Sequence, residues 1–217
     1  EQDYWYQEMI RQGFIPTHNE IPLPDTRIIV APGLDPAIIN HFSGAEWQEA
    51  LRACKCMGLR SEVFAKDAPK IGPTPDEIEK ELTPFTVATH NCVIELLQPK
   101  GQNNHAIFIV KESEAVVYSY ERNTADPRVS HNLNISFDEY ANVIESAFIM
   151  YPRVIADTSL PQATKDAQNQ TLISYVVNNF TNDIDTDNNY RVRLPSEVRT
   201  YELKGVAKTN PHFSLAD

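Results

Sequence analysis

The chain has 217 residues, 15 prolines against only 7 glycines, and a formal net charge of -11. A surface this acidic repels phosphate backbones and anionic lipid, so we expect neither nucleic acid nor a membrane surface as a partner. The glycines form no phosphate-binding motif, and the cysteines and histidines show no spacing typical of a metal centre. No cofactor and no metal ion are therefore predicted.

Hydrophobic residues make up 41% of the sequence, which is enough for one sizeable core. We predict a single domain over residues 1–204, with an irregular proline-containing segment at residues 14–26. Residues 205–217 are expected to form a flexible tail. An odd count of 3 cysteines favours a reducing compartment such as the cytoplasm, and secretion after removal of a signal peptide stays open.

Helix start signals dominate the N-terminal half. Asp35 and Thr74 each precede a proline, which is the pattern of an N-cap followed by proline at the first helical position. Ser43 and Glu46 form a capping box, and the β-branched run at residues 27–31 indicates a strand. The helices predicted here cover residues 3–12, 35–42, 43–57 and 74–83.

The hydrophobic period approaches two after residue 85. Apolar residues alternate on both sides of a polar link at residues 111–114, which predicts an antiparallel hairpin over residues 105–122. Further elements are predicted as strands at 132–135 and 191–194 and as helices at 136–151 (opened by a capping box), at 159–180 and from residue 196. The predicted fold class is α+β, with a small antiparallel sheet flanked by helices.

The candidate site centres on Cys92. Asn91 can cap a helix over residues 92–98, which would place the Cys92 thiol at a helix N-terminus, where the dipole favours the thiolate. His105 would begin the first strand of the predicted hairpin and serve as the base. Glu121 or Asn123, at the end of the facing strand, would orient its ring.

The stretch from His105 to Asn123, in which HAIFIV and AVVYSYERN flank a polar turn, resembles the papain-like and transglutaminase-like cysteine enzymes. The resemblance implies a thiol-dependent acyl-transfer enzyme acting on a protein or peptide, with Cys92 as nucleophile, His105 as base and Asn123 as the orienting group. Only 13 positions separate Cys92 from His105, a shorter gap than these families show. His131 is therefore the alternative base, with Asp138 or Asp157 to orient it.

Residues 92–97 also fit a strand, because a short apolar run does not distinguish helix from strand by its period. Residues 99–104 would then form a hairpin loop, and Cys92 would be a core residue. The protein would in that case be a non-catalytic interaction domain or effector that binds another protein.

Two further motifs are present near the C-terminus. Asp183, Asp185 and Asp187 alternate as in a calcium-binding EF-hand loop, but Leu194 occupies the twelfth position, so a solvated acidic turn is favoured. Residues 210–213 form an NPxF tetrapeptide, similar to peptides that phosphotyrosine-binding-type domains recognise through a β-turn and an aromatic anchor.

Overall fold

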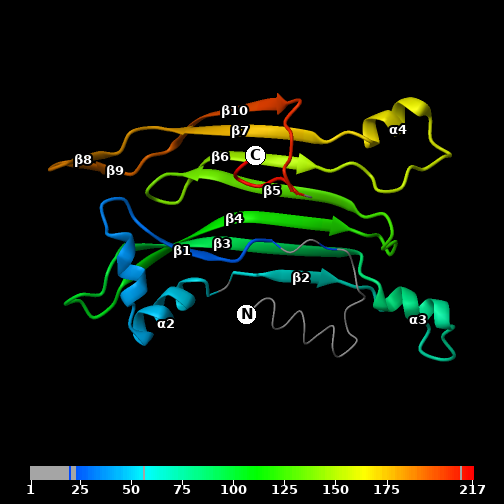
Figure 1. The fold of residues 1–217 in the computed structure, drawn as a ribbon, viewed down its shortest axis with the longest axis horizontal. Helices are drawn as coiled ribbons and strands as arrows, with labels where there is room; N and C mark the ends of the chain where they lie inside the picture. Colours follow the sequence, from blue (N-terminus) through cyan, green and yellow to red (C-terminus); the bar gives the residue numbers. More distant parts are fainter. Residues whose placement is uncertain (1–19, 21–22, 56, 211) are drawn as a thin grey trace.

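The chain forms one large mixed β-sheet in a computed structural model that describes residues 20, 23–55, 57–210 and 212–217 (Figure 1). Among the described residues, eight strands belong to this sheet, and two short strands form a separate hairpin. The strands are β1 (Arg27–Val30), β2 (Arg60–Val63), β3 (Thr86–Gln98), β4 (Ile107–Ser119), β5 (Arg128–Phe137), β6 (Val143–Met150), β7 (Leu172–Phe180), β8 (Ile184–Thr186), β9 (Asn189–Arg191) and β10 (Pro195–Leu203).

The strand order is β1-β3-β4-β5-β6-β7-β10, and all pairs from β3 to β10 are antiparallel. Strand β3 is 13 residues long, and two shorter strands share its outer edge. Strand β1 pairs in parallel with residues 93–96 of β3, and β2 pairs antiparallel with residues 86–89. Strand β10 is the edge strand on the opposite side of the sheet.

The helices are short and lie at the margins of the sheet (Figure 1). They are the 3-10 helix η1 (Pro36–His41) and the α-helices α2 (Gly44–Ala53), α3 (Pro75–Leu82) and α4 (Gln162–Gln168). The predicted capping box of α2 is present, because Ser43 and Glu46 bond each other's backbone N–H groups, and Thr74 and Glu77 do the same at α3. None of the described helices is long and apolar enough to cross a bilayer.

One face of the sheet carries most of the core, and we call it the covered face. Residues paired across neighbouring strands point to the same face. The row Val116, His131, Ile149 and Ile173, which crosses β4 to β7, is buried along its whole length. Helix α2 packs over one end of this face, where Ala50 meets the residues of β3.

The C-terminal segment, which we define as residues 204–210 and 212–217, runs back across the covered face (Figure 1). Its Phe213 is only 6% exposed and packs in the cluster that contains Leu133 and Ile149. The Phe213 backbone N–H donates to the Tyr151 hydroxyl at 2.9 Å. Residues expected from the sequence to form a loose tail thus contribute an anchor to the core.

The predicted fold class is wrong, because the sheet is large and the helices are few. The predicted hairpin over residues 105–122 is one continuous strand, β4. Its supposed turn at residues 111–114 lies in mid-strand, where Lys111 forms an ion pair with Glu95 and Glu112 lies 2.6 Å from His90. These polar side chains indicate cross-strand pairing instead of a turn.

Three predicted helices are also wrong. The supposed capping box at residues 136–139 straddles the end of β5 and the turn to β6. In this turn, residues 138–142, the Asp138 carboxylate accepts the backbone N–H groups of Tyr140 and Asn142. The helix expected over residues 159–180 is the short α4 followed by β7, and that expected from residue 196 is β10. The helix predicted over residues 3–12 lies outside the described residues.

Candidate functional site

Cys92 lies within strand β3, at a β-bulge between Asn91 and Cys92. The predicted helix over residues 92–98 is wrong, and the alternative of a strand followed by a hairpin loop is confirmed. The Cys92 side chain is 2% exposed, and its sulfur lies 3.6 Å from the Thr26 hydroxyl and 3.8 Å from the Cys54 sulfur. A helix dipole is therefore not available to favour its thiolate.

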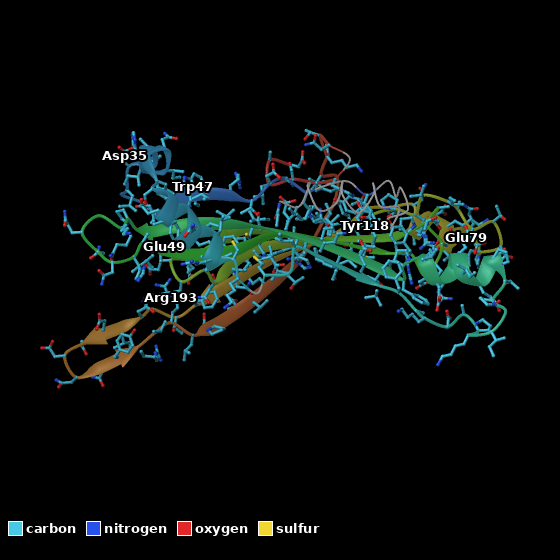
Figure 2. All side chains as sticks on the ribbon, turned by 90° about the horizontal axis from the view of Figure 1, so that it is seen from below. Asp35, Trp47, Glu49, Glu79, Tyr118 and Arg193 are labelled. Atoms are coloured by element: carbon cyan, nitrogen blue, oxygen red, sulfur yellow. The ribbon has the colours of Figure 1, made fainter. Side chains whose placement is uncertain are left out.

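His105 lies in the loop between β3 and β4, where its side chain is 78% exposed. Its Nδ1 lies 2.7 Å from the Glu49 carboxylate, so α2 holds this ring at the margin of the sheet (Figure 2, which labels Glu49). Asn123 lies beyond the opposite end of β4, where its amide oxygen accepts the Ala125 N–H in a turn. The intervening strand has 13 residues, about 40 Å at roughly 3.3 Å per residue, so His105 and Asn123 are not brought together.

His131 is fully buried in the middle of β5. Its Nδ1 lies 3.0 Å from the Tyr151 hydroxyl, and its Nε2 lies 3.3 Å from Glu114 without the alignment of a hydrogen bond. The two carboxylates proposed to orient this ring have other partners: Asp138 binds turn N–H groups, and Asp157 accepts from Ser159.

The structure surrounds His131 with aromatic rings, and we call Tyr118, His131, Tyr151, His212 and Phe213 the ring cluster. The His212 ring lies 4.9 Å from Tyr151 and 6.0 Å from His131 between centroids, and its Nε2 lies 3.4 Å from the Tyr118 hydroxyl. Tyr118, labelled in Figure 2, lies near the C-terminal end of β4. Because His212 is 81 positions beyond His131, no local pattern in the sequence indicates this contact.

Burial controls protonation in the ring cluster. It lowers the pKa of His212 to about 4, with smaller contributions from the charges of His131 and Lys208. Burial also raises the pKa of Tyr151 to about 12. Both rings are therefore held neutral at pH 7, which suits a structural core of aromatic contacts.

The aspartates at residues 183–187 do not form a calcium loop. Asp183 precedes β8, and both its oxygens accept hydrogen bonds from Arg193, which lower the pKa of this carboxyl. Arg193 also lies over the Tyr140 ring and contacts Asp138. Arg193, labelled in Figure 2, thus ties the base of the projecting β8–β9 hairpin to the turn after β5. Within the described ranges, no three acidic, histidine or cysteine side chains gather around a space suited to a metal ion.

The second face of the sheet, which we call the bare face, is covered by no described helix. Over β6, β7 and β10 it presents three exposed apolar side chains, which we call the terminal patch: Phe148, Leu172 and Val198, exposed by 45%, 50% and 63%. They are spread along the strands, because Phe148 pairs with Ser174 and Val198 pairs with Asn178, six positions beyond Leu172 on β7. Beside this patch, the outer edge of β10 pairs with no described strand, so its backbone N–H and C=O groups are available to a partner.

Residues 49–194 match the family described as insecticide toxin TcdB middle/C-terminal region. The chain belongs to this family. The resemblance to papain-like and transglutaminase-like enzymes is therefore wrong as an assignment, and the hydrolase class that it implied has no support. No curated protein matches the sequence.

Solved structures share the fold. A crystal structure of TcdB2-TccC3 matches with a TM-score of 0.67 and 18% identity, over 91% of this chain and 10% of that one. A crystal structure of TcdB2-TccC3-Cdc42 matches with the same TM-score and identity, over 91% and 9%. The Photorhabdus luminescens Tc holotoxin pore with a TccC3-D651A mutation matches with a TM-score of 0.63 and 16% identity. This match covers 91% of the present chain and 9% of the other chain. The chain thus spans about a tenth of the chains that it matches.

Proposed function

We propose that this chain is a non-catalytic structural module of a toxin-complex component, which uses the terminal patch and the edge of β10 to bind a TccC3-type protein. The bare face and the edge of β10 carry this proposal, because three apolar side chains on adjacent strands are 45–63% exposed there and the outer edge of β10 pairs with no described strand. An unpaired strand edge with exposed apolar side chains beside it is a surface to which another protein can add a strand.

The family and the fold support a role in assembly. The solved chains that share this fold over 91% of the sequence contain TcdB2 together with TccC3. An interaction domain is the alternative to the thiol enzyme that the sequence itself leaves open. The positions of Cys92, His105 and Asn123 favour that alternative, because each of the three side chains contacts other residues.

The experiment measures the binding of the chain to a recombinant TccC3-type protein by sedimentation. Val198→Lys and Leu172→Lys each place a charge in the terminal patch, and we expect either change to weaken binding at least 10-fold, or by about 1.4 kcal/mol. Ile71→Lys is the matched control, since Ile71 is 92% exposed in a loop far from β10 in the chain. Unfolding temperatures verify that all three variants are folded.

Unchanged binding by both patch variants would refute the proposed interface. Wild-type protein that does not bind the TccC3-type protein at all would refute the choice of partner.

A further inference from the structure

The molecule contains a pair of thiols that the proposed function does not use. The Cys54 and Cys92 sulfurs lie 3.8 Å apart, although 38 positions separate the residues in the sequence. Cys92 is in β3, and Cys54 is the C-terminal cap of α2. Both are free cysteines.

The two thiols differ in access. Cys92 is 2% exposed, whereas Cys54 is only partly buried at the helix end. Cys54 is therefore the thiol that a reagent in solution reaches first, and Cys92 is placed directly behind it. A partly exposed thiol with a second thiol in contact is the arrangement of an attacking and a resolving cysteine.

At 3.8 Å, the two sulfurs are in van der Waals contact. A disulfide bond requires about 2.05 Å between the sulfurs, so about 1.8 Å remains to be closed. Rotation of the two side chains and a small shift of the last turn of α2 would have to supply this movement. Ala50, Ile94 and Met57 belong to the same apolar cluster, and the Thr26 hydroxyl lies 3.6 Å from the Cys92 sulfur. A disulfide is compatible with these surroundings.

We propose that Cys54 and Cys92 form a site of intramolecular disulfide formation, driven by thiol–disulfide exchange with a small-molecule disulfide such as oxidised glutathione. This site is independent of the terminal patch and of its partner. In the oxidised state, α2 is covalently tied to β3 across the covered face.

The reaction balances in two steps. The Cys54 thiolate attacks one sulfur of the oxidant, whose S–S bond breaks and releases one small thiol. Cys92 then attacks the Cys54 sulfur of the mixed disulfide, and the second small thiol leaves. Two protein thiols are oxidised, one small disulfide is reduced to two thiols, and the two protons pass through solvent to the released thiolates.

Burial raises the pKa of the Cys54 thiol to about 11, and the neighbouring Cys92 adds to this effect. The attacking thiolate is thus scarce at neutral pH, and its population rises about tenfold per pH unit up to that value. The bond should accordingly form slowly at pH 7 and much faster at pH 8.5.

The experiment incubates the folded chain with oxidised glutathione at pH 8.5, stops the reaction with acid, and analyses an unreduced digest by mass spectrometry. We expect a peptide containing Cys54 joined to one containing Cys92. We also expect a Tm about 5 °C higher, which dithiothreitol reverses. Cys56→Ser is the matched control, two positions from Cys54, and should keep the bond, whereas Cys54→Ser should abolish it.

Three results would overturn the proposal. One is a Cys54–Cys56 disulfide as the main product of the folded wild-type chain. Another is a stable glutathione adduct on Cys54 with Cys92 still free. The third is a folded chain whose three thiols all remain reduced after oxidation at pH 8.5.

Discussion

His212 should make the stability of the protein depend on pH below neutrality. Its ring is half-buried in the ring cluster, between Tyr151 and His131, with Lys208 and Glu114 also acting on its charge. Its pKa falls from 6.5 in the unfolded chain to about 4 in the folded one. Between these pH values the unfolded state binds more protons than the folded state. The stabilising contribution of the neutral His212 ring is therefore fully present above pH 6.5 and is lost as the pH falls towards 4.

The size of this effect on the free energy of unfolding follows from the two pKa values of His212. The gap between pH 6.5 and about 4 corresponds to about 3 kcal/mol, at roughly 1.4 kcal/mol per pH unit. Because the ring keeps part of its contact with water, screening reduces the effect, and we expect about 1–2 kcal/mol. Protonation of His212 would place a charge among aromatic rings, and the C-terminal segment should detach more readily from the covered face.

The assay is urea unfolding at pH 7.5 and pH 4.5 for the wild type and for His212→Asn, which lacks the titrating ring. Other carboxylates and histidines titrate in both proteins, so the difference between the two losses isolates His212. We expect the wild type to lose about 1–2 kcal/mol more than the variant. His41→Asn, at an exposed histidine, is the control and should behave as the wild type. Equal losses for the wild type and His212→Asn would refute the reasoning.

Three further predictions concern single contacts. Phe213→Ala should lower the free energy of unfolding in urea by about 3 kcal/mol, because it removes a buried ring from the core, and a loss below about 0.5 kcal/mol would contradict the anchoring role. Ser43→Ala should lower the free energy of unfolding by about 1 kcal/mol in the same assay, because it removes the N-cap of α2, and an unchanged urea midpoint would contradict this capping role. Arg193→Ala should speed amide hydrogen exchange in β8 and β9, while Arg191→Ala should not, and equal exchange in both variants would contradict the bracing role of Arg193.

Local signals in the sequence identified the elements that depend on local chemistry. The capping box at Ser43 and the proline after Thr74 mark the starts of α2 and α3, because these signals act within one helical turn. The β-branched run at residues 27–31 marks β1 for the same local reason.

The wrong predictions share a physical cause. Ser136 satisfies a helix start pattern, but its hydroxyl donates to Glu145 on the facing strand, and Asp138 forms a turn. Whether such a pattern caps a helix or closes a hairpin depends on the next segment of the chain, and residues 143–150 are rich in β-branched and aromatic side chains. The polar run at 111–114 is equally ambiguous without its partners across the sheet.

The candidate site was partly visible in the sequence. Cys92 and His131 are buried positions of the core, but their neighbours come from distant segments: Cys54 from α2 and His212 from the C-terminus. Spacing along the chain carries no information about these contacts, because the sheet topology alone brings the residues together. The terminal patch was invisible for the same reason, since its members lie on strands whose sequences predict helices.

The shared outer edge of β3 has a consequence for the order of folding. Strands β3 to β7 join neighbours in the sequence, whereas β1 pairs with residues 66 positions later. Closing so long a loop costs chain entropy before the strand pairing contributes any favourable energy. Strand β1 can therefore dock only on a β3 that has already formed. Residues 27–85 should therefore add last to a preformed meander. On unfolding they should leave first, which exposes the outer edge of the 13-residue strand β3 to new partners.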